Sequence, residues 1–250
     1  MYIYIYLLFI IVVIGIIIVY TYEDNKLDET YADNKLDKTY ADNKLDKTYA
    51  DNMLDKTFYT IDETYPILNN INFDLLLNDL NNVKNMNWKE WPEFDLLKNK
   101  ENTQNSKWTV FPIKSFGKWS NKYIKLCPYI YNIFKNNDDI INIGFSRLTP
   151  NTVLNKHQGW ANLSNYILRC HLALTVPGAA YIYCENDKQQ HIPGKWIIFD
   201  DSKIHYADNL GNDDRIVLIV DIIRPNNVKK GISNIKDSDE LITFIKEFQE

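Results

Sequence analysis

The chain has 250 residues and a formal net charge of −5 at pH 7, with 28 Lys and Arg against 33 Asp and Glu. The basic residues do not gather into the clusters that a nucleic-acid-binding face requires, so no nucleic-acid partner is expected. Three cysteines, Cys127, Cys170 and Cys184, are too few for a disulfide scaffold and match no zinc-ligand spacing. Buried free thiols are the favoured interpretation, and one disulfide stays open for a lumenal or extracellular domain.

Residues 1–20 (MYIYIYLLFIIVVIGIIIVY) form an apolar run with no charged side chain before Glu23. About 20 apolar residues span a bilayer as a helix. The run is too long for the apolar part of a cleaved signal peptide, and it lacks a basic leader and a small-residue cleavage site. A transmembrane signal anchor is therefore predicted. Too few basic residues flank the run for charge to set its orientation.

Residues 21–65 repeat a nine-residue unit, TYADNKLDK, that decays toward its end. Each unit carries one aromatic and one aliphatic side chain, which share a face neither as a helix nor as a strand. The rest of the unit is too polar to offset the entropy lost on folding. A solenoid is the alternative, but such repeats need glycine at tight turns and none lies between Gly15 and Gly117. A flexible linker is predicted.

Residues 66–250 are long enough for one domain with a sizeable core. Apolar spacing predicts a helix over 67–86, and the segments at 127–134 and 240–250 predict short helices. Short strands are predicted at 108–113, 141–148, 167–176, 179–184, 196–201 and 215–223, separated by turn residues such as Pro177-Gly178. This pattern indicates a mainly β fold, a double-stranded β-helix or jelly roll of the cupin type with flanking helices.

Three of the four histidines fall where strands meet loops or lie within a strand. His157 follows the strand at 141–148, and His205 follows the one at 196–201. His171 lies two residues after Arg169, so alternation puts both side chains on one face of their strand. Arg215 begins a buried-looking strand and needs an anionic partner there. The remaining histidine, His191, lies in the polar turn KQQHIPG and receives no role.

Several motifs in order give these residues more weight than each has alone. FSRLTPNTVLNKHQGWANLSNYILRCHLALTVP, GKWIIFDDSKIHYA and DRIVLIVDIIRP resemble the aspartyl/asparaginyl β-hydroxylase family of Fe(II)- and 2-oxoglutarate-dependent dioxygenases. The family pattern has a first metal-binding His in an H-x-G or H-x-D loop, an R-x-H-L-x-L strand and a second His after F-D-D-S. A terminal R-x-x-x-x-x-D-x-x-x-P closes it. The resemblance covers residues 108–225.

The resemblance implies a role for each matching residue. His157 and His205 would bind Fe(II), for which imidazole is a suitable ligand. Arg215 would pair with the distal carboxylate of the cosubstrate 2-oxoglutarate, and Ser146 would donate a hydrogen bond to the same carboxylate. Arg169 and His171 would lie near its metal-bound end; O2 is the other cosubstrate. These four residues form the implied cofactor-binding set, and the two histidines the implied catalytic pair.

One position departs from the wider oxygenase superfamily. Most non-haem Fe(II) oxygenases bind the metal with two His and one carboxylate, whereas Gly159 stands where H-x-D would place the acid. The resemblance includes an H-x-G form, so two protein ligands are expected. Asp200 and Asp201 are nearby acids, and we expect them to serve the fold and not the metal.

The main hypothesis is a single-pass, type II membrane protein whose lumenal or extracytoplasmic domain hydroxylates Asp or Asn side chains of a peptide or protein substrate. A hydroxylase of lipid acyl chains is an alternative within the same family, and it would need a long apolar groove. A catalytically inactive cupin-like binding module is an alternative from another class, against which the complete set of His and Arg residues argues. A structural stalk protein with its function in the repeats is a further alternative.

Overall fold

The computed structural model of the chain describes residues 53–93 and 106–249. Within these ranges, none of the helices has the length and apolar character needed to cross a membrane. The predicted anchor at 1–20 and most of the predicted linker lie outside the described residues. The end of the linker is folded: Leu54 bridges to Val228, and residues 58–59 pair with a later strand. The folded unit therefore begins before Pro66, the boundary that the sequence predicts.

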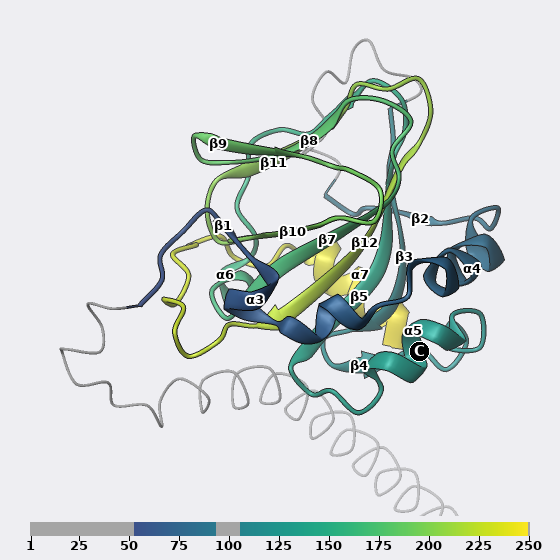
Figure 1. Ribbon diagram of the computed structural model, residues 1–250, viewed down its shortest axis with the longest axis horizontal. Helices are drawn as coiled ribbons and strands as arrows, with labels where there is room; N and C mark the ends of the chain where they lie inside the picture. Colours follow the sequence, from purple (N-terminus) through teal and green to yellow (C-terminus); the bar gives the residue numbers. More distant parts are fainter. Residues whose placement is uncertain (1–52, 94–105, 250) are drawn as a thin grey trace, which may run out of the picture. The chain divides into compact units, whose positions relative to one another are not determined.

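Two antiparallel sheets make up the described part of the chain (Figure 1). The larger has the order β1-β10-β7-β12-β5-β3-β2, with β4 paired to β3, and the smaller has the order β6-β11-β8-β9. The strands are β1 Phe58–Tyr59, β2 Lys89–Glu90, β3 Trp108–Ser115, β4 Lys118–Trp119, β5 Ile140–Leu148, β6 Thr152–Val153, β7 Ile167–Thr175, β8 Ala180–Cys184, β9 Asp187–Gln190, β10 Trp196–Phe199, β11 His205–Asn209 and β12 Arg215–Ile223.

From β5 to β12 the chain alternates between the two sheets. β5, β7, β10 and β12 lie in the larger sheet, whereas β6, β8, β9 and β11 lie in the smaller. This alternation is that of a double-stranded jelly roll, in which the strands of two facing sheets enclose an interior. A cluster of buried side chains from both sheets, including Leu148, Ile182, Phe199 and Ala207, fills the space between them. The predicted mainly β architecture is confirmed.

All six predicted strands are present, within a few residues of their expected bounds. The helix predicted over 67–86 is divided into a 3₁₀-helix, η1 (Pro66–Asn70), and an α-helix, α4 (Phe73–Val83). Asn72 causes the break, because its side chain accepts a hydrogen bond from the Leu75 N–H and caps the first turn of α4. Three further α-helices are α3 (Ile61–Thr64), α5 (Pro128–Phe134) and α6 (Ala161–Ser164).

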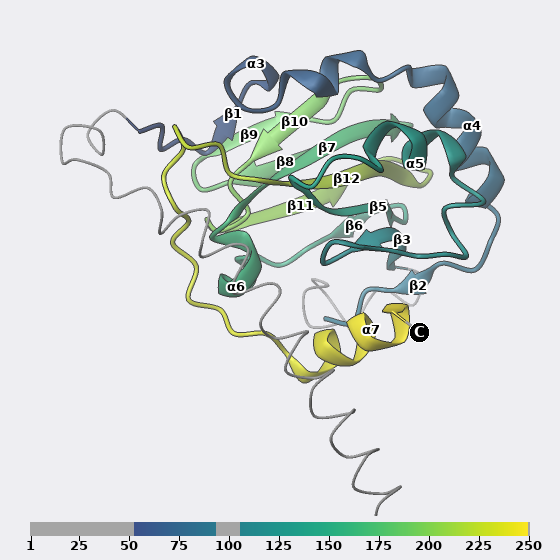
Figure 2. The ribbon, with the colours of Figure 1, turned by 90° about the horizontal axis from the view of Figure 1, so that it is seen from below.

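Helices α4 and α5 cover the outer face of the larger sheet (Figure 2). Leu76, Leu80 and Val83 form the buried stripe of α4. The buried carboxylate of Asp79 accepts the Tyr129 and Ile130 N–H groups at the start of α5, which Cys127 does not cap with its side chain. A last helix, α7 (Asp239–Gln249), lies on the other side of the sheet, beneath β3 in Figure 2.

The strand register places polar side chains on the inner face of the larger sheet. Arg169 of β7 is opposite Asp221 of β12, and His171 is opposite Ile219. Ser146 of β5 is opposite Val217, which lies two residues after Arg215. Since alternate residues share a face, these groups converge between the sheets. The alternating residues Leu168, Cys170 and Leu172 pack against the helices instead. All three cysteines are buried and free, as the favoured interpretation expected.

Candidate active site

His157 and His205 are brought together by two backbone hydrogen bonds. The His157 N–H donates to the His205 carbonyl over 2.9 Å, and the His205 N–H donates to the His157 carbonyl over 2.8 Å. His205 is the first residue of β11, and His157 lies in the loop after β6, where this pairing is an isolated bridge. The ring centroids are 4.3 Å apart. Two residues separated by 48 positions in the sequence thus share one site.

Both imidazoles are oriented through Nδ1. The Nδ1 of His157 is 2.8 Å from the Asn155 carbonyl oxygen, and that of His205 is 2.9 Å from the Lys203 carbonyl oxygen. Because a carbonyl only accepts, each Nδ1 carries the proton and each Nε2 presents a lone pair. Such a hydrogen bond from Nδ1–H to a backbone carbonyl fixes the tautomer and the ring orientation of metal-binding histidines.

Both rings are neutral at neutral pH. Burial, reinforced by the neighbouring His205, lowers the pKa of His157 to about 3. Burial also lowers the pKa of His205 to about 4, while its contact with the Lys203 carbonyl opposes the shift. Neutral imidazole is the form that binds metal ions. The pair is therefore competent as a ligand set without any loss of protons.

Asp201 lies next to this pair but is engaged elsewhere. Its Oδ1 is 3.4 Å from Nε2 of His205 and 2.7 Å from Nη1 of Arg169. Burial raises the pKa of Asp201, and the Arg169 guanidinium opposes that rise. Within residues 53–93 and 106–249 there is no cluster of three His, Cys, Asp or Glu side chains arranged to hold a metal ion. Asp201 thus borders the dihistidine pair without completing a ligand triad.

Arg169 uses its donors on two carboxylates. Nε and Nη2 donate to Asp221 over 2.8 and 3.0 Å, and Nη1 donates to Asp201. The other acid of the F-D-D-S motif, Asp200, accepts from the buried Arg224 and from Ser202. These ion pairs fix the turn between β10 and β11 from which His205 emerges. The contact of Arg169 with a cosubstrate stays a prediction.

Arg215 is buried, at 2% exposure, and its Nε and Nη1 have no hydrogen-bond partner in the protein. Burial lowers its pKa to about 10, while the Asp208 carboxylate opposes the shift, so the guanidinium stays charged at neutral pH. An unpaired buried cation is costly, and a charged ligand of opposite sign offsets that cost. The site therefore has the chemistry of an anion pocket, as the sequence predicts for Arg215.

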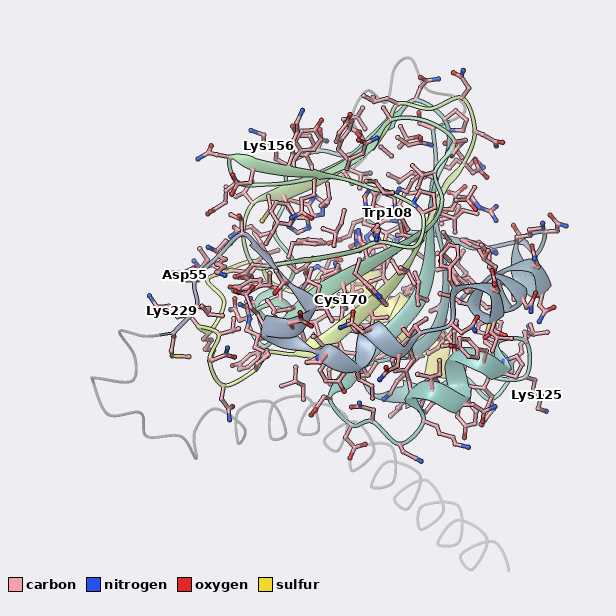
Figure 3. The ribbon with its side chains drawn as sticks, in the orientation of Figure 1. Asp55, Trp108, Lys125, Lys156, Cys170 and Lys229 are labelled. Atoms are coloured by element: carbon pink, nitrogen blue, oxygen red, sulfur yellow. The ribbon has the colours of Figure 1, made fainter. Side chains whose placement is uncertain are left out.

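Ser146 and Trp108 border the same space. The Trp108 indole Nε1 donates to Ser146 Oγ over 3.0 Å, which leaves the hydroxyl proton of this buried serine free to donate to a ligand. Trp108 lies between the two sheets in Figure 3, with its ring centroid 6.4 Å from that of His157. Trp108 thus lies next to both Ser146 of the predicted anion pocket and His157 of the dihistidine pair.

His171 faces the same interior and has a partner that the sequence does not indicate. Its Nδ1 is 3.2 Å from Nε2 of His191. His191, to which the sequence gives no role, is 1% exposed, so its side chain is buried although the segment around it is polar. The Nε2 of His171 and the Nδ1 of His191 have no hydrogen-bond partner in the protein. His191 is identified only by its contact with His171 of β7, 20 residues earlier in the chain. No local sequence pattern predicts that contact.

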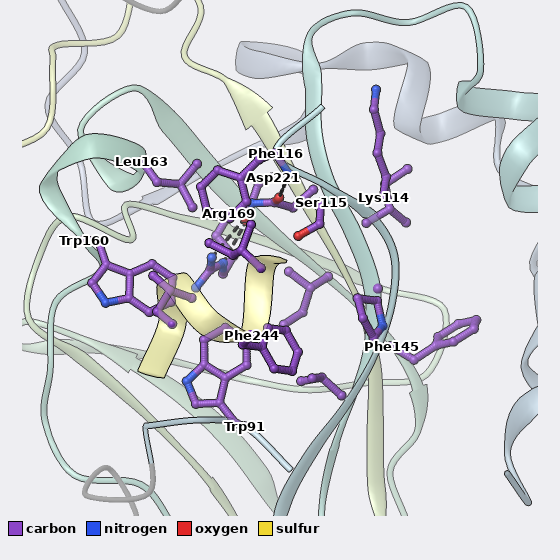
Figure 4. Close-up of a pocket in the computed structure, with 18 of the residues that line it drawn as sticks. Trp91, Lys114, Ser115, Phe116, Phe145, Trp160, Leu163, Arg169, Asp221 and Phe244 are labelled. Carbon is purple, nitrogen blue, oxygen red and sulfur yellow. Dashed lines mark hydrogen bonds and ion pairs between the residues drawn. The ribbon is translucent and has the colours of Figure 1, made fainter. Parts of the chain in front are cut away.

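A pocket of about 80 Å³ lies next to the ion pair between Arg169 and Asp221 (Figure 4). Its apolar wall includes Trp91, Trp160, Leu163, Phe244 and Ile245, and its polar end includes Arg169 and Asp221. The Trp91 ring stacks between those of Trp108 and Trp160, at centroid distances of 4.9 and 5.7 Å. Helix α7 supplies Phe244 and Ile245, so the C-terminal helix closes one side of the pocket.

A family model described as aspartyl/asparaginyl beta-hydroxylase matches residues 70–225. The chain is 31% identical over 133 residues to aspartate beta-hydroxylase domain-containing protein 2 of Xenopus tropicalis, covering 50% of this chain and 35% of that one. It is 32% identical over 123 residues to ornithine lipid ester-linked acyl 2-hydroxylase of Rhizobium tropici, covering 48% and 43%. The matches thus span less than half the length of these relatives.

Among solved structures, an oxidoreductase of the 2OG-Fe(II) oxygenase family from Burkholderia pseudomallei matches with a TM-score of 0.35 and 14% identity, covering 49% of this chain and 71% of that one.

Proposed function

Since the chain belongs to the aspartyl/asparaginyl β-hydroxylase family, we propose that it is an Fe(II)- and 2-oxoglutarate-dependent dioxygenase. Its substrate is an Asp or Asn side chain of a peptide or protein. The observation that carries the proposal is the buried guanidinium of Arg215, with Nε and Nη1 unpartnered, in the same interior as two histidines with available Nε2 lone pairs. The carboxylate of an anionic cosubstrate would accept from the guanidinium, and a metal ion would bind the two Nε2 lone pairs.

In the proposed enzyme, Nε2 of His157 and Nε2 of His205 hold the metal. The chemistry that Fe(II) supplies when bound is activation of O2, coupled to oxidation of 2-oxoglutarate to succinate and CO2 and to hydroxylation of the substrate. Arg215 binds the distal carboxylate of 2-oxoglutarate through its guanidinium N–H groups, and the Ser146 hydroxyl donates to the same group. The stacked indoles of Trp108 and Trp91 exclude water from the interior beside His157.

Turnover of 2-oxoglutarate tests the proposal. The purified chain is incubated with Fe(II), 2-oxoglutarate and Asp- or Asn-containing peptides, and succinate is measured. Fe(II)-dependent turnover is expected, together with its loss in His205→Ala and Arg215→Met. Arg147→Met is the matched control, because this arginine stacks over Trp88 and contacts Asp214, away from the histidine pair. No succinate and no 2-oxoglutarate binding by a folded chain would contradict the proposal.

A hydroxylase of lipid acyl chains is the second candidate, and the apolar pocket is the observation that favours it. Trp91, Trp160, Phe244 and Ile245 offer an acyl chain an apolar wall, and Trp108 links this wall to the dihistidine pair. The name of the Rhizobium tropici relative refers to acyl 2-hydroxylation of a lipid. Incubation with an ester-linked lipid and detection of one added oxygen in its acyl chain distinguishes this activity from peptide hydroxylation.

We also propose that residues 1–20 anchor the protein as a single-pass, type II membrane protein with residues 66–250 lumenal or extracytoplasmic. The uninterrupted apolar run supports the anchor, and the orientation follows from the resemblance to the family. Extraction of membranes with alkaline carbonate should leave the full chain in the pellet, and protease added outside sealed vesicles should spare the catalytic domain. Release by carbonate would contradict the anchor.

A further inference from the structure

The place of His191 in the fold is set by two contacts. Its backbone N–H donates to the Ala180 carbonyl over 2.9 Å, which holds the residue just after β9. Its ring lies beside that of His171, with the centroids 5.5 Å apart and an angle of 21° between the planes. Nearly coplanar rings at this distance, with 3.2 Å between Nδ1 of His171 and Nε2 of His191, have the geometry of an in-plane hydrogen bond.

The number of protons on this pair is limited. Burial, together with the positive charge of Arg215, lowers the pKa of both rings well below the usual value. Each ring is therefore neutral and carries one N–H. Since the two facing nitrogens share one proton, only two arrangements are possible. Either His171 Nδ1–H donates to His191, or His191 Nε2–H donates to His171.

The two arrangements differ in what His171 presents to the site. In the first, the unpartnered Nε2 of His171 is a lone pair, which repels a carboxylate. In the second, the same Nε2 carries the proton and donates. The titratable groups that act on His171 are the cationic Arg215 and Arg169 and the neutral rings of His191 and His205. With Nε and Nη1 of Arg215 also unpartnered, an anion entering this space selects the second arrangement.

We propose that His191 is a positioning residue for the cosubstrate site: it donates from Nε2 to Nδ1 of His171 and so holds His171 as an Nε2–H donor to a carboxylate of 2-oxoglutarate. The inference rests on the proposed function, because it assumes that 2-oxoglutarate is the anion bound beside Arg215. It assigns a role to a residue whose sequence context indicates none. The residue acts through His171 and does not touch the ligand itself.

Binding of 2-oxoglutarate, measured by calorimetry with Mn(II) in place of iron, tests the proposal without relying on turnover. Loss of one hydrogen bond to a charged ligand should weaken binding about tenfold in His191→Leu. His191→Gln should stay within about threefold of wild type, because its amide N–H can donate to His171. In a His171→Leu background, His191→Leu should cause no further loss, since the two residues act as one unit. Melting temperatures identify any variant that does not fold.

A spectroscopic readout follows the proton directly. In ¹⁵N-histidine spectra of the wild-type chain, saturating 2-oxoglutarate should put the His171 proton on Nε2 and the His191 proton on Nε2. Protonation of His171 at Nδ1 in the complex would overturn the inference. So would equal loss of affinity from His191→Leu with and without His171, because a purely structural role would give that result.

Failure of the inference and failure of the proposed function give different results. If 2-oxoglutarate binding is lost in Arg215→Met but unchanged in His191→Leu, the role of His191 is contradicted and the proposed function is not. No binding of 2-oxoglutarate to the folded wild-type chain removes both.

Discussion

The position that a Cβ atom at Gly159 would take lies 2.0 Å from Oδ2 of Asp201 and 2.8 Å from Cβ of Ser164. A side chain at residue 159 would therefore displace a carboxylate that is held by Arg169 and that borders His205 Nε2. The glycine of the H-x-G tripeptide is explained by this packing. The Asp201 carboxylate occupies the space that a side chain at residue 159 would need.

Gly159→Asp is consequently expected to destabilise the protein and not to add a third metal ligand. Two carboxylates would compete for one buried volume, and overpacking of this kind costs about 1–3 kcal/mol in the free energy of unfolding. Thermal unfolding and Zn(II) calorimetry measure the two effects. Gly159→Asp/Asp201→Gly is the matched control and should recover most of the lost stability. A single variant that is as stable as wild type and binds Zn(II) more tightly would contradict the explanation.

Arg215→Met should stabilise the ligand-free chain while abolishing 2-oxoglutarate binding. Replacing an unpaired buried charge by an apolar side chain of similar length is expected to raise the free energy of unfolding by about 1–3 kcal/mol. The binding site loses its cation at the same time. Denaturant unfolding without and with 2-oxoglutarate measures both, and ligand-dependent stabilisation should be present only in the wild type. Lower stability of the ligand-free variant would indicate that Asp208 pairs with Arg215 more strongly than its position suggests.

The sequence predicts most of the larger sheet because its strands carry the alternating apolar pattern of a half-buried surface. β9 (DKQQ) and β11 (HYADN) lack that pattern, the first because it is exposed and the second because it presents His205 to the interior and carries the polar residues Asp208 and Asn209. Ordered motifs identify the proposed metal-binding histidines, His157 and His205, together with Arg215 and Ser146. The His191 contact, the Gly159–Asp201 packing and the tryptophan stack depend on residues brought together by the fold, so local spacing does not contain them.

The His171–His191 pair should make stability depend on pH. Both pKa values are lowered in the folded state by burial and by Arg215, so protonation favours the unfolded chain. The stability that the two neutral, buried rings contribute is fully present above the ordinary histidine pKa of about 6.5. It is lost as the pH falls below that value, because the unfolded chain then binds protons that the folded chain does not. Each group gives a slope of about 1.4 kcal/mol per pH unit over that window.

Denaturant unfolding in buffers between about pH 7.5 and 5 measures how steeply the free energy of unfolding changes with pH. In the double variant His171→Leu/His191→Leu, the free energy of unfolding should depend less steeply on pH than in the wild type. The part of the pH dependence that comes from His157 and His205 should remain. His171→Leu alone should remove part of the difference. An unchanged slope in the double variant would show that the two rings are not held neutral by the fold.

The pocket closed by α7 should discriminate between the two candidate substrate classes. Leu163→Trp adds a large ring to the apolar wall, and the pocket of about 80 Å³ has no room for an acyl chain beside it. Turnover of a lipid substrate should then fall at least about tenfold in kcat/KM, a loss of about 1.4 kcal/mol in transition-state binding. Peptide hydroxylation should stay within about threefold, because the dihistidine pair and Arg215 are untouched. Ile232→Trp, at an exposed position outside the pocket, is the control. Equal loss of both activities would mean that the pocket serves the fold of the site and not one substrate class.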